Sequence, residues 1–285
     1  MGDNETPTRT SAHECSYFVI SQCQRYDDLA SEVYCQLLNQ LTSNPDKESM
    51  ERGLQFLLVL AVSVLPDEEL MDYVIAFVKR LEDSRDYGSL AQESMSRLRW
   101  ASGSKLSLRK MPPSVSELKA LQKIFTLHAK VGNDLRVPVT VVSPNGQLHP
   151  ISCTYYTKIT DPALMSTLAE KFLVPHEYSR EFSIFVEYKD EEVIVNDAAY
   201  LLDVISFYDV KSVATLNYYN LVYKRRLWLS KPEEALGNPT LLDFVFHQLK
   251  TSFLDGFLPV SQKDVAHAAS LLFVALQLDH DCTLE

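Results

Sequence analysis

The sequence predicts an α+β protein of more than one domain, helical at first, with a small sheet in the middle and helices again at the end. Apolar residues recur at helical spacing up to about residue 100. The spacing changes to strand-like alternation at residue 137, and helical spacing returns at residues 241–254 and 261–278. A length of 285 residues agrees with about two domains.

The composition is that of an ordinary globular protein, with 46% hydrophobic and 23% charged residues. The net charge of -11 argues against general binding of nucleic acid, which rewards basic surfaces. The longest strongly apolar run, residues 54–65, is too short to span a bilayer, and the polar N-terminus does not resemble a secretory signal. The five cysteines are unclustered, as expected for reduced thiols in the cytoplasm.

The first part of the chain predicts a helical bundle. A stripe of apolar residues at every fourth position predicts the first long helix: Leu29, Val33, Leu37 and Leu41. The turn-forming residues 44–46 end it. Residues 53–65 are apolar all round, which predicts the central, fully buried helix of the bundle.

Two further helices complete this bundle. Pro66 ends the central helix, and three acidic residues from Asp67 to Glu69 occupy the first turn of the next helix, where the helix dipole favours negative charge. The expected buried face of that helix is formed by Leu70, Tyr73, Val74, Phe77 and Leu81. Another helix fits residues 89–100, and no strand-like alternation precedes residue 124. Residues 1–120 are therefore predicted to be all-helical.

The middle of the chain predicts a small sheet. Alternation at 137–141, a turn at 143–146 and a returning strand at 148–155 form a hairpin. Asp161 followed by Pro162 starts a helix over 163–173. Two strands, 182–188 and 193–195, flank a turn at 189–191, and a short helix follows at 201–207. Strand, strand, helix, strand, strand and short helix is the order of a ubiquitin-like β-grasp.

Two segments resemble a known family. Residues 31–51 read SEVYCQLLNQLTSNPDKESME and are followed by Arg52-Gly53, which closely resembles the core of the myosin tail homology 4 domain. Residues 108–120, LRKMPPSVSELKA, resemble the exit of that domain. The family usually has Trp after Arg-Gly; Leu54 stands there in this chain and keeps the apolar character.

The resemblance implies how the chain is divided. In known families this domain is usually followed by a FERM module, and residues 224–228 and 254–261 resemble the entry to its helical second lobe. The expected parts are an N-terminally truncated myosin tail homology 4 domain over 1–120, a ubiquitin-like first FERM lobe over 121–232 and an incomplete helical second lobe over 233–285. The largely apolar helix at 261–278 is expected to need neighbours, and a missing part of the lobe explains this better than an interface.

The chain contains no motif that organises chemistry. A phosphate-binding glycine loop, an HExxH pair and a GxSxG elbow are all absent from the sequence. His280 and Cys282 could ligate a metal, but a solvated tail is the better interpretation. We therefore expect no enzymatic activity, no catalytic residues, no cofactor and no metal.

The junction after the helical part is unusually basic. Residues 97–123 contain one acidic residue, Glu117, and seven basic residues: Arg97, Arg99, Lys105, Arg109, Lys110, Lys119 and Lys123. One interpretation is a solvated linker with scattered charges. The other is a surface for an acidic partner such as tubulin, similar to what tail domains of this family are reported to bind. Several weak ion pairs could together steer a salt-sensitive association.

The resemblance implies a non-catalytic binding module in the tail of an unconventional myosin. Expected partners are cargo or scaffold proteins, with microtubules as a further candidate; actin would be reached only through a motor domain outside this chain. Nucleic acid is not expected, membrane contact is expected to be weak or indirect, and the expected location is cytoplasmic and cytoskeleton-associated. The alternatives are a motor-less FERM-type adaptor linking membrane and cytoskeleton, and a truncated product without function.

Overall fold

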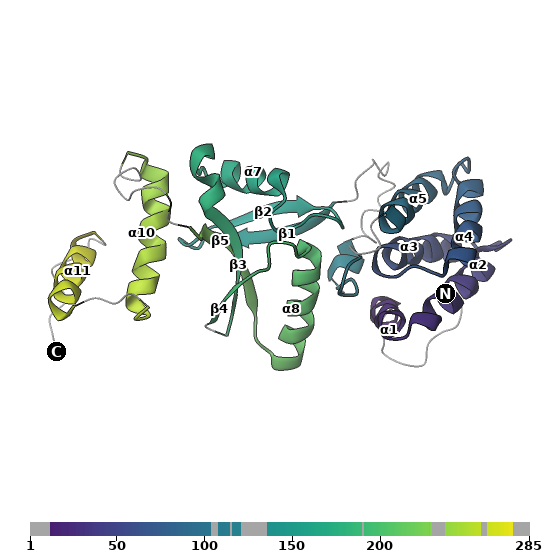
Figure 1. Ribbon diagram of the computed structural model, residues 1–285, viewed down its shortest axis with the longest axis horizontal. Coiled ribbons are helices and arrows are strands. Elements are labelled where there is room, and N and C mark those ends of the chain that lie inside the picture. Colours follow the sequence, from purple (N-terminus) through teal and green to yellow (C-terminus); the bar gives the residue numbers. More distant parts are fainter. Residues whose placement is uncertain are drawn as a thin grey trace. The chain divides into compact units, whose positions relative to one another are not determined.

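The computed structural model describes residues 12–103, 108–114, 116–120, 136–189, 191–227, 229, 237–257 and 261–275. The chain divides into two compact units, Met1–Leu229 and Ser230–Glu285. The described part of the first unit holds a group of helices and a sheet, and that of the second holds two helices (Figure 1).

Five helices come first in the described part of the first unit, and the predicted helical character of this region is confirmed. They are α1 (Ala12–Arg25), α2 (Asp27–Leu41), α3 (Lys47–Ser63), α4 (Glu68–Leu81) and α5 (Gly88–Gly103). Helix α3 contacts α1, α2 and α5, and Leu54, Leu57 and Leu60 on it are fully buried. The prediction of a central buried helix is therefore confirmed, although it begins at Lys47.

Capping side chains explain where two of these helices begin. The Asp46 carboxylate accepts a hydrogen bond from the Glu48 amide at 2.9 Å, so α3 starts before the apolar run. The Asp67 carboxylate accepts from the Leu70 amide at 2.8 Å and caps α4 as its acidic first turn predicted. The prediction of a buried Tyr73 is wrong, because this side chain is 71% exposed on the outer face of α4.

Gly88 leaves room for a close backbone approach at the start of α5. A Cβ atom placed there would lie 2.5 Å from the main-chain oxygen of Glu82, whereas one at Gly103 would meet nothing within 4 Å. We expect Gly88→Ala to lower the free energy of unfolding by about 1–3 kcal/mol through overpacking. Urea denaturation measures this, with Gly103→Ala as the matched control; equal stability of the two variants would contradict the expectation.

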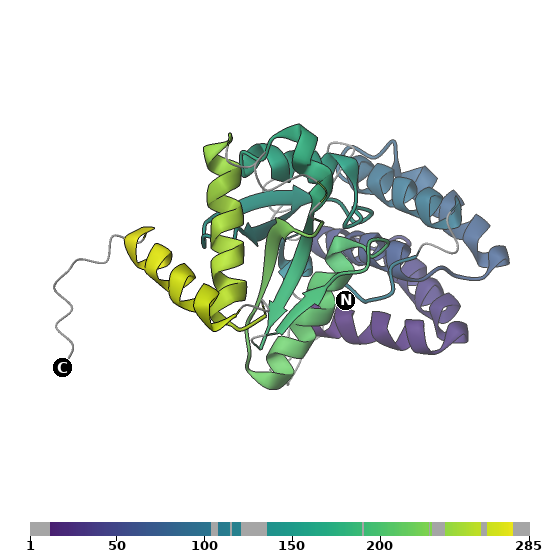
Figure 2. The same ribbon diagram turned by 60° about the vertical axis from the view of Figure 1, so that its left-hand side comes forward.

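The sheet of the first unit has the order β2-β1-β5-β3-β4. The strands are β1 (Val137–Val142), β2 (Leu148–Cys153), β3 (Phe182–Tyr188), β4 (Glu191–Ile194) and β5 (Tyr219–Arg225). β1 and β5 run parallel, and the other neighbours are antiparallel, with Val137 opposite Cys153 and Phe182 opposite Arg225. Helices α7 (Pro162–Lys171) and α8 (Leu201–Thr215) and the 3-10 helix η2 (His176–Glu181) accompany the sheet (Figure 2).

Two features of this region differ from the prediction. Helix α8 continues to Thr215, so it is not the short helix expected at 201–207. Strand β5 was not predicted, because its basic end overlaps residues 224–228, which resemble the entry to the second FERM lobe. The structure buries that end instead: Arg225 Nε lies 2.6 Å from a Glu181 carboxylate oxygen, and Lys224 pairs with Glu192. Paired charges can occupy a buried strand that an unpaired charge would disrupt.

The second unit holds α10 (Pro239–Leu254) and α11 (Gln262–Ala275). Asn238 caps α10. Ser261 and Asp264 form a capping arrangement at the start of α11, with 2.6 Å between the Ser261 hydroxyl and the Asp264 carboxylate. Apolar side chains of α11 such as Leu271 and Val274 are exposed. Among the residues described, none of the helices has the length and apolar character needed to cross a membrane.

Candidate functional site

The basic junction is not one continuous surface. Arg97 is 1% exposed and Arg109 is 2% exposed, so both are removed from the predicted partner-binding set. The reason is that each guanidinium is paired with carboxylates inside the first unit, where a partner cannot reach it. A count of charges along the sequence cannot distinguish a buried pair from a solvated charge.

Arg109 connects residues that are far apart in the sequence. Its Nε donates to Asp203 Oδ1 at 2.7 Å, and its Nη1 donates to Glu117 Oε1 at 2.6 Å. The other Asp203 oxygen accepts from the Lys110 amide at 2.8 Å. One buried arginine therefore joins the segment after α5 to the first turn of α8, beside the sheet.

The electrostatics of this cluster keep Arg109 charged. Burial alone lowers the pKa of the guanidinium, but the negative charges of Glu117 and Asp203 more than reverse this, so the pKa is raised above its usual value. The hydroxyl of Ser206, one turn further along α8, donates to the main-chain oxygen of Pro112. The Pro-Pro segment is thus held to α8 by side-chain and main-chain bonds together.

Arg97 forms a second buried connection within the first unit. Its Nε donates to Glu93 Oε1 at 2.8 Å, and its Nη1 donates to the Leu58 main-chain oxygen at 2.9 Å. The guanidinium carbon lies 4.4 Å from the centre of the Tyr155 ring, a cation–π distance. Trp100 meets the same ring edge-on at 5.2 Å. The last part of α5 therefore packs on Tyr155, two residues after the end of β2.

The remaining predicted residues have different positions. Arg99, Lys110 and Lys119 are exposed. Lys105 and Lys123 lie outside the described residues, as do His280 and Cys282. Among the described residues, three exposed cations of the predicted surface therefore remain available to an acidic partner.

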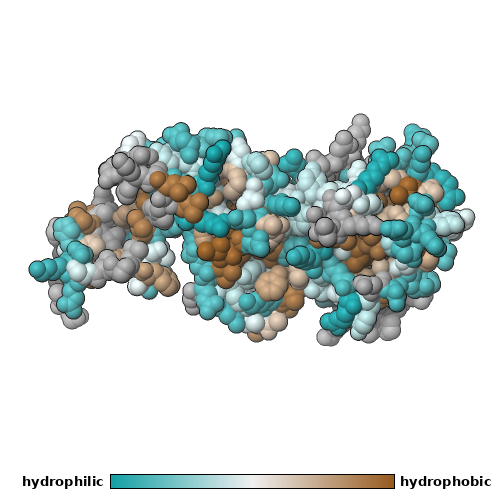
Figure 3. Space-filling view, viewed as in Figure 1, coloured by the Kyte–Doolittle hydropathy of each residue, from teal (hydrophilic) through white to brown (hydrophobic). Residues whose placement is uncertain are grey.

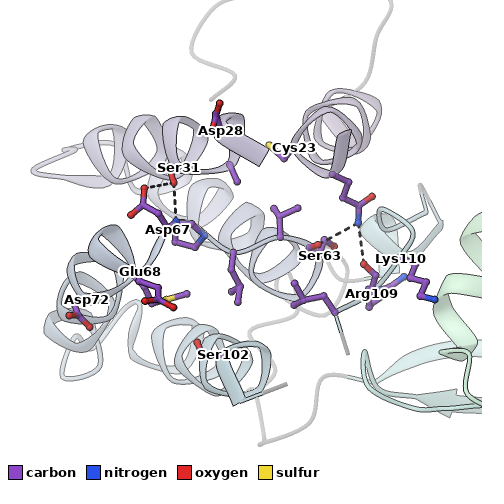
Figure 4. A pocket seen from close by; sticks show the side chains of 17 residues that line it. Cys23, Asp28, Ser31, Ser63, Asp67, Glu68, Asp72, Ser102, Arg109 and Lys110 are labelled. Carbon is purple, nitrogen blue, oxygen red and sulfur yellow. Dashed lines mark hydrogen bonds between the residues drawn. The ribbon is translucent and has the colours of Figure 1, made fainter. Parts of the chain in front are cut away.

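A groove of about 1060 Å³ lies among the helices of the first unit (Figure 4). The end of α1, the start of α2, the α3–α4 connection, the start of α4 and the Leu108–Lys110 segment form its walls. The apolar part of the lining consists of Ala30, Val64, Leu65, Pro66, Met71 and Leu108. Gln24 Nε2 donates to the Arg109 main-chain oxygen at 3.2 Å, so this side chain ties two walls together.

The rim of the groove is acidic at one end. The carboxylates that line it are Asp28, Asp67, Glu68 and Asp72, and all four side chains are exposed. Hydrogen bonds from the Leu70 amide and then the Ser31 hydroxyl lower the pKa of Asp67, which stays ionised at neutral pH. The Ser31 hydroxyl donates to Asp67 Oδ2 at 2.8 Å, so this part of the rim has a fixed geometry.

The described residues contain no group of three or more potential metal ligands. Cys23 and Cys153 are buried, and burial raises the pKa of both thiols, that of Cys153 to about 12. Neither thiol is therefore in the reactive thiolate form at neutral pH.

A second exposed feature is apolar. Figure 3 shows hydrophobic residues gathered over the sheet-bearing part of the first unit among mainly hydrophilic ones. On α8 the exposed apolar side chains are Phe207, Val210 and Val213, spaced three residues apart along one face of the helix. The groove, in contrast, combines an apolar floor with charge.

The sequence did not point to the groove. The sequence predicts Asp67 and Glu68 at the start of a helix, which is correct, but it does not predict that they line one groove with Asp28. The only signal was the number of acidic residues near Pro66, and helix starts explain that number equally well. The groove exists because the α3–α4 connection lies next to the start of α2, a tertiary contact.

Comparison with known proteins gives a family match for the helical part. Residues 16–120 match the model of the MyTH4 domain family. The chain is 26% identical over 278 residues to unconventional myosin-XVB of Homo sapiens, covering 95% of this chain and 8% of that protein. It is 27% identical over 285 residues to unconventional myosin-VIIb of Mus musculus, covering 93% of this chain and 12% of that protein. The chain thus spans only a small part of these relatives.

Solved structures match the fold of nearly the whole chain. The MyTH4-FERM MF2 domain of Dictyostelium discoideum myosin VII matches 100% of this chain and 57% of its own, with a TM-score of 0.78 and 18% identity. The C-terminal MyTH4-FERM domain of human myosin 7b, solved in complex with the harmonin-a PDZ3 domain, matches 98% of this chain and 55% of its own. Its TM-score is 0.71 and its identity 24%.

Proposed function

We propose that this chain, a MyTH4 domain at residues 16–120 followed by part of a FERM fold as in the tails of unconventional myosins, is a non-catalytic module that binds other proteins of the cytoskeleton. The observation that carries the proposal is the MyTH4 family match together with the MyTH4-FERM fold. Its mechanism is surface complementarity, and its location is with the cytoskeleton in the cytoplasm.

The proposed division of the chain follows the same relationship. Residues 1–120 form the MyTH4 domain, 121–232 the ubiquitin-like first FERM lobe and 233–285 the beginning of the helical second lobe. The change from helices to a five-stranded sheet at β1 supports the first boundary. The second boundary is supported by the separation of a compact unit that begins at Ser230. Arg97 and Arg109 hold the helices to the sheet region, which favours a module whose first two parts act as one body.

Scaffold and cargo proteins are the proposed partner class. The human myosin 7b MyTH4-FERM domain was solved with the PDZ3 domain of harmonin-a, a protein partner, and this supports protein binding as the role of the shared fold. Actin would be reached through a motor domain outside this chain.

Microtubules are a further proposed partner, through the exposed cations Arg99, Lys110 and Lys119. We expect the triple Glu variant of these residues to pellet several-fold less with microtubules at low salt, and added salt to reduce the pelleting of the unaltered chain. Co-sedimentation of the full chain measures both effects.

The matched control reverses three exposed cations elsewhere in the first unit, Lys79, Lys171 and Arg180. It has the same net charge as the test variant, so it separates a local surface from total charge. Equal pelleting of the unaltered chain and the junction variant would exclude this surface as the tubulin site. Leaving Arg97 and Arg109 in place keeps the fold intact in both variants.

A further inference from the structure

We infer that the groove of the helical part binds a short segment of another protein that carries Arg or Lys beside apolar residues. The inference rests on the proposed binding function and adds the chemistry of one partner. The groove's floor, its rim and the charges around it each support this occupant.

The floor suits apolar side chains. Val64 and Leu65 belong to the connection between α3 and α4, and Met71 faces the same space from the second turn of α4. Gln24 satisfies the main-chain oxygen of Arg109, which lies on the wall beside the end of α3. This wall therefore presents few unsatisfied polar groups, and an apolar side chain can contact it without leaving one buried.

The rim suits cations. Asp28 and Asp72 line the groove and are exposed at its edge. Asp67 lies on the same rim, where the Ser31 hydroxyl donates a hydrogen bond to it. Arginine and lysine can lay their aliphatic stems along such a floor while the charged heads reach carboxylates at its edge. Two basic residues line the groove. Arg109 is already paired with Glu117 and Asp203, and the exposed Lys110 lies on the side away from Asp67 and Asp72 (Figure 4).

The size of the groove favours a peptide segment over a small metabolite. Its volume of about 1060 Å³ lies just above the usual range of small-molecule pockets, and several separate elements form its walls. Several carboxylates spread over α2 and α4 match a partner with more than one cation. A row of charges of one sign also favours a fast, salt-sensitive encounter with a segment of opposite charge.

Fluorescence anisotropy with the full chain tests the inference. The probe is a labelled twelve-residue peptide of alternating Leu and Arg, and the comparison peptide has Glu in place of Arg. We expect the Arg peptide to bind and the Glu peptide not to bind. The double variant Asp28→Lys with Asp72→Lys is expected to weaken binding of the Arg peptide about tenfold, since attraction at two sites becomes repulsion.

The matched control reverses two exposed acids outside the groove, Glu170 and Glu177, and gives the same net charge. Equal weakening in this control would overturn the inference, because total charge would then explain the binding. Unchanged binding in the Asp28 and Asp72 variant would also overturn it.

Two other occupants would appear as distinct results. Light scattering that shows a dimer, separated into monomers by the Asp28 and Asp72 reversals, would make the groove a contact between copies and overturn the inference. Tighter peptide binding after deletion of residues 1–11 would make the chain's own beginning the occupant and overturn it too. The microtubule assay reports separately, because its variants keep the four rim carboxylates, and the peptide variants keep Lys110, which also lines the groove.

Discussion

The Arg109→Met variant is expected to lose about 3–5 kcal/mol of the free energy of unfolding. Methionine fills much of the space of the arginine stem but leaves the carboxylates of Glu117 and Asp203 without their buried cation. An uncompensated buried charge is more costly than the loss of the attraction itself. Urea denaturation of the full chain, monitored by Trp fluorescence and circular dichroism, measures the change.

Lys110→Met is the matched control for this variant. Lys110 is the next residue, its side chain is exposed, and its contact with Asp203 uses the main-chain amide, which methionine keeps. We expect its stability to stay within about 0.5 kcal/mol of the unaltered chain. A loss in Arg109→Met no larger than that of the control would contradict the buried cluster.

The Arg97→Met variant has the second large expected effect. It leaves Glu93 buried and unpaired, removes a hydrogen bond to the Leu58 main-chain oxygen and ends the cation–π contact with Tyr155. We expect a loss of about 3–5 kcal/mol in the free energy of unfolding, as for other broken buried pairs. Chemical denaturation measures it.

A double variant distinguishes two causes of that loss, the unpaired Glu93 carboxylate and the missing contacts of the arginine. Adding Glu93→Leu to Arg97→Met replaces the whole pair with apolar side chains, which is often close to neutral. We expect the double variant to recover most of the lost stability. A double variant as unstable as Arg97→Met would instead assign the loss to the Leu58 and Tyr155 contacts of the arginine.

These two arginines change how binding experiments on the junction should be designed. A variant that reverses every basic residue from 97 to 123 would break two buried clusters as well as the surface. Loss of binding in such a variant would then report unfolding. The exposed residues Arg99, Lys110 and Lys119 separate the question of recognition from that of stability.

The two candidate surfaces have opposite charges. The exposed cations of the junction suit an acidic partner, and the rim with Asp28, Asp67 and Asp72 suits a basic one. Opposite charges on one body allow two different partners to be distinguished by electrostatics, because each partner is repelled by the other surface. Their dependence on salt would be similar, so charge reversal at each site is the better way to tell them apart.

Much of the fold could be predicted from local patterns. The helical spacing of Leu37 and Leu41, the cap at Asp67 and the hairpin turn near Gly146 depend on neighbours in the sequence, and the structure contains each of them. Strand β5 was missed because its charged end is paired with Glu181 and Glu192, residues that are distant in the sequence. The prediction that Tyr73 is buried is wrong because helical spacing alone placed it on the apolar face of α4. In the structure α4 packs against α5 and α2, and Tyr73 stays exposed.

By itself the sequence predicted most of the helices and strands, several helix starts, and the resemblance to the myosin tail homology 4 domain, because these depend on residues close together in the chain. Only the tertiary structure decided which basic residues are surface and which are structural, and where acidic residues converge. Arg109 pairs with Asp203, far away in the sequence, and Asp28 lines the same groove as Asp67 because the helices pack together. The physical reason is that burial and pairing determine what a charge does, and both are properties of contacts between distant segments.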